Sequence, residues 1–105
     1  MDFSEYAERL GLEVDEFLEL AELLVDTSLA DLDNLETAIS NNDCEEASKS
    51  AHSIKGASGN LGFTEIFEQA KVLELNAKEG SLDGASASVA LIREKLTELA
   101  AAING

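Results

Sequence analysis

The sequence predicts an all-α domain, and three features of its composition support this fold class. The 105 residues contain no proline, so the commonest helix breaker is missing. Alanine, leucine and glutamate, which favour helices, dominate the chain. No run of β-branched and aromatic residues alternates with polar residues, so no strand is predicted. We expect an up-down-up-down antiparallel four-helix bundle with a short extra N-terminal helix.

The first 40 residues carry two helical patterns. Apolar residues at helical spacing over residues 3–10 predict a short amphipathic helix that ends near Gly11. A long helix is predicted from about Asp15 to Ser40, where two asparagines interrupt the pattern. The apolar stripe expected on this long helix consists of Phe17, Ala21, Leu24, Leu32, Leu35 and Ile39.

A third helix is predicted from Asp43 to about Leu61. Asp43 is its candidate N-cap, because Glu46 follows three residues later in the pattern of a capping box. The residues expected to face inward are Ala47, Ala51, Ile54 and Leu61.

Two more helices complete the predicted bundle. Thr64 is the candidate N-cap of the fourth, and Gly80 stands where a C-terminal glycine belongs. Asp83 is the candidate N-cap of the fifth. Connections of two to five residues imply antiparallel neighbours in a single domain that covers residues 1–105. Apolar stripes are formed in the fourth helix by Phe63, Ile66, Phe67, Ala70, Leu73 and Ala77, and in the fifth by Ala85, Val89, Ile92, Leu96, Leu99 and Ile103.

The net charge is −15 at pH 7, and it is unevenly distributed. Residues 1–48 hold fifteen acidic residues and one base, whereas residues 49–82 hold four lysines and four glutamates. The lysines thus gather in the segment that holds the only histidine, His52, although a solvated acidic surface with chance clustering explains this equally well. Because nucleic acid and anionic membranes would repel such a charge, we expect neither as a partner.

Other features point to a cytoplasmic protein. No apolar stretch approaches the roughly 20 residues that span a bilayer, and the first residues do not resemble a signal peptide. The single cysteine, Cys44, cannot form an internal disulfide. Its neighbours Asp43, Glu45 and Glu46 oppose thiolate formation, so we expect no reactive thiol. One histidine and one cysteine do not make a zinc site.

The third predicted helix contains glycines that its folding does not need, since glycine inside a helix costs about 1 kcal/mol relative to alanine. His52 lies about 100° from the buried stripe, at its edge. Side chains lean toward the helix N-terminus, so glycine at position 56 leaves the imidazole uncovered. Gly59 is expected to widen this clearing, and Ser48 to open the other side. Lys55, at i+3, can place its ammonium beside a group attached to the ring.

A motif in this helix carries a resemblance to a known family. The segment Ala51-His52-x-x-Lys55-Gly56, with Gly62 six residues beyond, resembles the signature of the histidine-containing phosphotransfer (HPt) family. The bare His-x-x-Lys-Gly pattern should arise by chance in on the order of one chain in a hundred of this length. Its place on the third helix of a small helical bundle makes it specific.

The resemblance extends over the whole chain, including Leu73-Glu74 in the fourth helix, and implies a role for each site residue. By resemblance, His52 is the phospho-acceptor, Lys55 helps to hold the phosphoryl group and Gly56 provides access. The family usually has a polar residue on the fourth helix that orients the histidine ring, and Glu74 matches that position.

The pattern around Glu74 agrees with this role, because Glu74 borders the apolar stripe and should face the third helix. A carboxylate that accepts the Nδ1–H would fix the tautomer and leave Nε2 as the nucleophile. The alternative is a surface pair between Glu74 and Lys78 at i, i+4, worth roughly 0.3–0.5 kcal/mol. Lys71 and Lys78 lie one turn either side of Glu74 and either supply further positive charge or are plain solvated lysines.

The resemblance implies a carrier that accepts a phosphoryl group from a receiver-domain aspartate and passes it to another receiver, without catalytic activity of its own. We expect a monomer with no cofactor, and the magnesium ion on the receiver, which should dock over the third and fourth helices.

Two other functions remain open. The phosphoacceptor region of a histidine kinase would need paired helices and an attached ATP-binding domain, and the chain has no glycine-rich nucleotide loop. A helical interaction module in which His52 is incidental is the second alternative.

Overall fold

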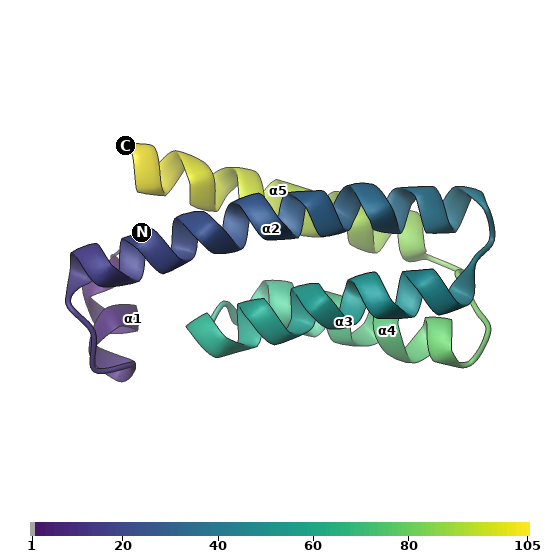
Figure 1. Ribbon diagram of the computed structural model, residues 1–105, viewed down its shortest axis with the longest axis horizontal. Coiled ribbons are helices and arrows are strands. Elements are labelled where there is room, and N and C mark those ends of the chain that lie inside the picture. Colours follow the sequence, from purple (N-terminus) through teal and green to yellow (C-terminus); the bar gives the residue numbers. More distant parts are fainter. Residues whose placement is uncertain (1) are drawn as a thin grey trace.

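The computed structural model describes residues 2–105, and all its regular structure within that range is helical (Figure 1). The predicted all-α class and the expected helix order are confirmed. The helices are α1 (Phe3–Arg9), α2 (Val14–Ser40), α3 (Cys44–Leu61), α4 (Thr64–Lys78) and α5 (Ala85–Asn104).

The four long helices form an antiparallel bundle. Each packs against its neighbours in a ring, with α2 against α3 and α5, and α4 against α3 and α5. In the view of Figure 1, α2 and α5 form the upper layer and α3 and α4 the lower one. The short α1 lies at the end of the bundle where α2 begins. None of the helices in residues 2–105 is long and apolar enough to cross a membrane.

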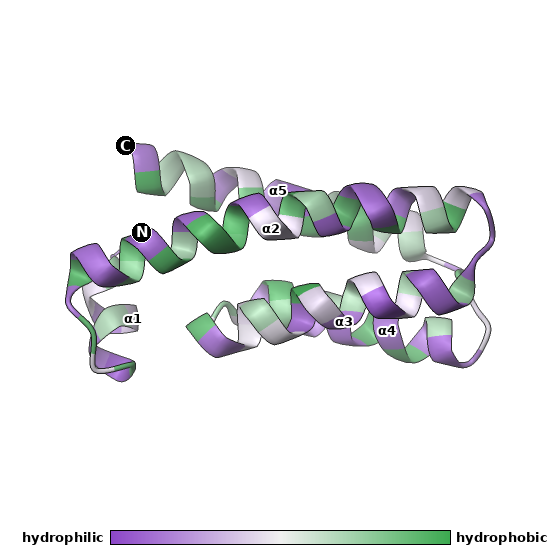
Figure 2. Ribbon diagram, in the orientation of Figure 1, coloured by the Kyte–Doolittle hydropathy of each residue, from purple (hydrophilic) through white to green (hydrophobic). Residues whose placement is uncertain are grey.

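The core lies along the bundle axis, where each helix contributes one apolar stripe. Figure 2 shows green and purple residues alternating along every long helix, as amphipathic helices require. The largest fully buried apolar side chains belong to α2, α3 and α5. They are Phe17, Leu32, Leu35, Ile54, Ile92, Leu96 and Leu99.

An aromatic cluster packs α1 against the end of the bundle. The ring of Phe17 on α2 lies 5.9 Å from Phe3 and 5.7 Å from Tyr6, measured between centroids. The Tyr6 ring also lies 5.1 Å from Phe63, which immediately precedes α4. Such pairs add about 0.5–1.5 kcal/mol each beyond their buried area. This cluster therefore fixes the C-terminal end of α3 and the start of α4, the two helices that carry the site.

The predicted helix starts are partly correct. Asp43 caps α3 as expected, because its carboxylate accepts a hydrogen bond of 3.1 Å from the Glu46 backbone N–H. Helix α2 begins at Val14, one residue before the predicted start, since Glu13 and Glu16 form a reciprocal capping box. Gly80 has φ +85° just beyond α4, as predicted for a C-terminal glycine.

The N-caps predicted at Thr64 and Asp83 are wrong. Phe63 takes the N-cap position of α4, and Thr64 is the first helical residue. The reason is tertiary, because burial of Phe63 in the aromatic cluster sets where the chain enters the helix. Before α5, Gly84 is the N-cap with φ +75°, a left-handed conformation that glycine adopts without strain.

Candidate functional site

Helix α3 positions His52 at the edge of its buried stripe. Ala51 and Ile54 are fully buried, whereas the His52 side chain is 67% exposed. One residue along a helix turns the side chain by about 100°, so the burial of Ala51 places His52 at the border between the core and solvent. The imidazole is thus fixed at its base and open at its tip.

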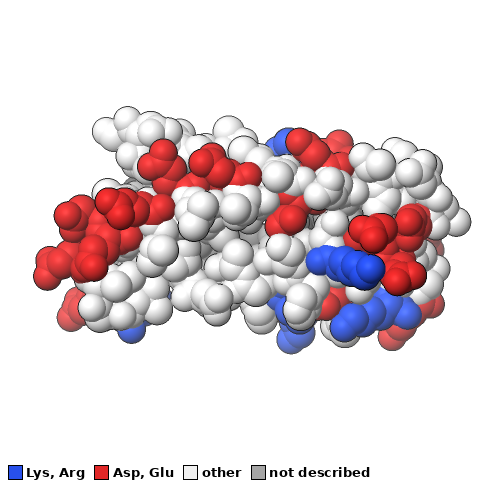
Figure 3. All heavy atoms as spheres, in the orientation of Figure 1, with Lys and Arg blue, Asp and Glu red and all other residues white. Residues whose placement is uncertain are grey.

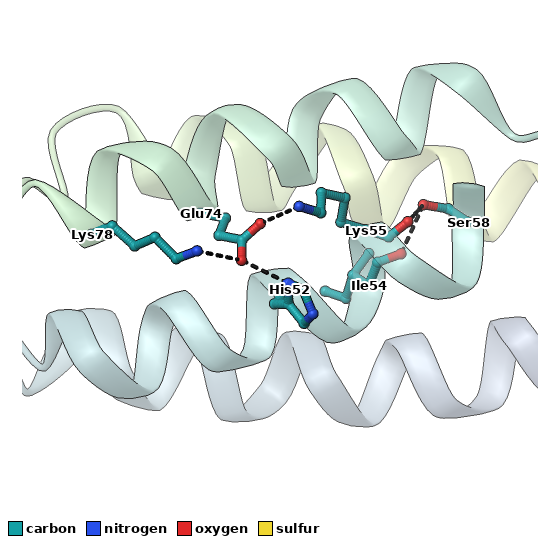
Figure 4. Close-up of polar contacts among 6 residues, drawn as sticks. All are labelled: His52, Ile54, Lys55, Ser58, Glu74 and Lys78. Carbon is teal, nitrogen blue, oxygen red and sulfur yellow. Dashed lines mark hydrogen bonds and ion pairs between the residues drawn. The ribbon is translucent and has the colours of Figure 1, made fainter. Parts of the chain in front are cut away.

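Glu74 on α4 faces this ring from the neighbouring helix. It is 2% exposed, and its Oε2 lies 2.7 Å from Nδ1 of His52 (Figure 4). An ionised carboxylate can only accept hydrogen bonds, so Nδ1 must carry the proton that it donates. The lone pair of the neutral ring is then on Nε2, and Figure 4 shows the second ring nitrogen pointing away from Glu74.

Two lysines approach the same carboxylate. Lys55 Nζ lies 2.6 Å from Oε1 of Glu74, and Lys78 Nζ lies 3.3 Å from Oε2. The i, i+4 contact between Glu74 and Lys78 that was expected for a surface pair is present. The carboxylate is buried, however, and it also contacts His52 and Lys55. Lys71 is exposed and forms no ion pair within residues 2–105.

These contacts determine the charge state of Glu74. Burial alone would raise the pKa of this carboxyl group. Hydrogen bonds from Lys55, His52 and Lys78 outweigh the burial and lower the pKa of Glu74 from 4.5 to about 2. Glu74 is therefore ionised at neutral pH, as the tautomer argument requires. The site therefore consists of an exposed imidazole nitrogen on His52, the buried carboxylate of Glu74, and the ammonium groups of Lys55 and Lys78.

The family model for the Hpt domain matches residues 19–102. The chain belongs to the Hpt domain family. The match covers most of α2 and the whole of α3 and α4, which include His52, Lys55, Gly56 and Glu74. Membership places the chain in histidine phosphotransfer of two-component signalling, in which Hpt domains carry phosphoryl groups and work with receiver domains. We found no match to the chain among curated proteins or among solved structures.

Two glycines of the Hpt domain's α3 differ in what surrounds them. Within residues 2–105, a Cβ added at Gly56 would meet no other helix or side chain within 4 Å. A Cβ at Gly59 would lie 3.0 Å from Cδ2 of Phe67 on α4. Gly59 therefore allows α4 to pack closely through Phe67, and it also lines a surface hollow together with Lys55 and Gly56.

Substitution of the two glycines should separate these roles. Gly56→Ala is expected to stabilise the fold by up to about 1 kcal/mol, because it gains helix propensity without a clash. Gly59→Ala should gain less, since Phe67 must shift. A larger Gly56→Leu should slow phosphoryl transfer sharply while the protein stays folded. Urea unfolding measures the changes in stability, and a transfer assay measures the rate of phosphoryl transfer. Normal transfer by Gly56→Leu would contradict the access role of Gly56.

An apolar groove beside α3 is a feature that the sequence reasoning missed. Leu20 and Leu23 on α2 are 41% and 58% exposed, and they lie off the buried stripe of that helix. The presence of leucines outside the buried stripe could have indicated this groove from the sequence. Ala57 lies about 7.5 Å along α3 from His52, five residues further on. The groove is lined by Leu10, Leu12, Leu20, Leu23, Leu24, Thr27, Ala57, Asn60 and Leu61.

Charged side chains are unevenly distributed over the surface of this Hpt domain. Figure 3 shows acidic side chains over α1 and the start of α2, whereas lysines lie beside further acidic side chains over α3 and α4. Fewer charged side chains lie in the middle of this face. An acidic partner surface would thus be repelled less at the His52 end than at the other end.

Proposed function

We propose that this Hpt domain accepts a phosphoryl group on Nε2 of His52 from the aspartate of a receiver domain and passes it to another receiver. The observation that carries the proposal is the exposed imidazole whose Nδ1 is held by the buried carboxylate of Glu74 at 2.7 Å. This contact leaves Nε2 as the open, nucleophilic nitrogen.

The transfer follows from this arrangement. The Nε2 lone pair attacks phosphorus in line, the N–P bond forms, and the P–O bond to the aspartate breaks to leave a free carboxylate. The proton on Nδ1 stays in place, so the phosphorylated ring carries a positive charge. The Glu74 carboxylate faces that charge and stabilises it. The reverse sequence of bond changes delivers the phosphoryl group to the next receiver, so the domain works in either direction.

Positive charge for the transferring group comes from Lys55, which is one turn beyond His52 and 26% exposed. We assign the magnesium ion of the reaction to the receiver. The residues around His52 favour this assignment, since they are lysines and one carboxylate that already accepts three hydrogen bonds.

We propose that the receiver docks over α3 and α4 around His52 and also reaches the apolar groove on α2 and α3. Leu23→Ala is expected to weaken receiver binding by about tenfold, as loss of about 1.4 kcal/mol would. Its matched control is Leu91→Ala, since Leu91 is also an exposed leucine, at 36%, and lies on α5, outside the proposed docking face. Titration of each variant with a receiver measures binding, and equal effects of both substitutions would remove α2 from the docking face.

Incubation with a receiver and acetyl phosphate tests the proposed function. Mass spectrometry should show one phosphoryl group on the Hpt domain only when receiver and magnesium are present. A histidine kinase fragment would instead be a dimer that takes label from ATP once joined to its ATP-binding domain. We expect a monomer by gel filtration, and no label from ATP when the ATP-binding domain of a histidine kinase is added. An interaction module would take no label from any donor.

A further inference from the structure

The carboxylate of Glu74 accepts three donors at once, and this number exceeds what orienting one imidazole requires. Its Oε1 contacts Lys55 at 2.6 Å, and its Oε2 contacts His52 Nδ1 at 2.7 Å and Lys78 at 3.3 Å. Figure 4 shows the two lysines approaching from opposite sides of the carboxylate. The three donors differ in exposure, since the side chain of Lys55 is 26% exposed and that of Lys78 is 61% exposed.

The position of Lys55 conflicts with its role in transfer. In the unphosphorylated protein Lys55 is held by Glu74, on the Nδ1 side of the ring. The phosphoryl group attaches to Nε2, on the other side, and brings about two negative charges. Lys55 lies on a flexible stem of four carbons, so its ammonium can turn from Oε1 to a phosphoryl oxygen. Glu74 then loses its shortest contact while it remains buried.

A buried carboxylate that loses a donor is destabilised in its position. Lys78 is placed to prevent this, because it lies on the same helix as Glu74 at i, i+4. Its contact does not depend on α3, which carries both His52 and Lys55. It also contacts Oε2, the oxygen that His52 uses, and so holds that oxygen at Nδ1 when Oε1 is released.

We propose that Lys78 is a positioning residue, which keeps Glu74 against His52 while Lys55 moves to the phosphoryl group. The proposal rests on the proposed function, since it requires a phosphoryl group on Nε2. Lys55 then has two anionic partners in turn, Glu74 in the resting protein and the phosphoryl group in the loaded one. Lys78 keeps a single partner throughout.

The test compares Lys78→Ala with Lys71→Ala. Both residues are exposed lysines on α4, one turn either side of Glu74, and only Lys78 contacts it. Single-turnover transfer from a phosphorylated receiver is measured over a range of receiver concentrations. Lys78→Ala should lower the rate constant at saturating receiver by about five- to tenfold, and Lys71→Ala should change it less than twofold. A mere loss of surface charge would instead raise the receiver concentration needed for half saturation, equally in both variants.

Nitrogen-15 NMR of the single imidazole gives a second readout. In the resting protein Lys78→Ala should keep the Nδ1–H tautomer, because Lys55 still holds Glu74. In combination with Lys55→Met the tautomers should mix, although Lys55→Met alone should retain the wild-type tautomer through Lys78. Lys78→Arg should restore the transfer rate.

The possible failures are distinguishable. A wild-type protein that takes no label from a receiver would overturn the proposed function itself. If the wild type is labelled, equal saturating rates for Lys78→Ala and Lys71→Ala would overturn the positioning role alone. A double variant that keeps the wild-type tautomer would do the same.

Discussion

Replacing His52 by glutamine is expected to abolish phosphoryl uptake, with a fall of at least about 10³-fold in the transfer rate. Glutamine has no nucleophilic nitrogen, and the chain has no other histidine. Because the His52 side chain is 67% exposed, the fold should survive. Intact-mass spectrometry after incubation with a phosphorylated receiver measures uptake, and circular dichroism checks the helices. Label on a folded His52→Gln protein would exclude His52 as the acceptor.

Substitution of Glu74 should produce the second largest loss. Glu74→Ala removes the acceptor for Nδ1–H, so the imidazole tautomers should mix and transfer should slow by on the order of 10²-fold. Glu74→Gln keeps a hydrogen-bond acceptor but loses the charge, and should retain more activity than Glu74→Ala. Nitrogen-15 NMR of His52 reports the tautomer directly. An unchanged spectrum in Glu74→Ala would leave Glu74 as a partner of the two lysines only.

The same residue should make stability depend on pH. The folded protein lowers the pKa of Glu74 to about 2 from 4.5, so its contribution is fully present above about pH 5 and lost as the pH falls toward 2. At pH 3 the loss should be about 2 kcal/mol, at 1.36 kcal/mol for each pKa unit. Urea unfolding of the wild type should therefore lose this much more stability between pH 7 and pH 3 than unfolding of Glu74→Gln. Parallel profiles would contradict an ionised, stabilising Glu74.

The helices could be predicted from the sequence because each carries a long apolar stripe that must be buried. The stripe of α2 places Phe17, Leu32 and Leu35 in the core, where the structure has them. The N-caps at Thr64 and Asp83 could not be predicted from capping preference alone. Burial of Phe63, a tertiary contact, sets the start of α4, whereas the left-handed backbone at Gly84, a local feature, sets the start of α5.

The site likewise has features that the sequence predicts and features that it does not. The approach of Glu74 to His52 follows from sequence, because Glu74 borders the stripe that faces α3. The engagement of Lys55 with Glu74 does not, since a lysine at i+3 reaches several positions and the burial of Glu74 selects one. The packing role of Gly59 depends on where Phe67 lies across the helix interface, and residue spacing within α3 carries no information on that.

We expect the phosphoryl group to reside on Nε2 of His52. The most direct measurement transfers label from a phosphorylated receiver to the wild-type protein and then determines the chemical stability and position of the label. A phosphoramidate is lost in acid and survives alkali, and peptide mapping should place it on His52. Phosphorus-31 and nitrogen-15 NMR should show phosphorus coupled to Nε2 while Nδ1 keeps its proton. Label that is lost in alkali, as an acyl phosphate on aspartate or glutamate would be, would contradict the account.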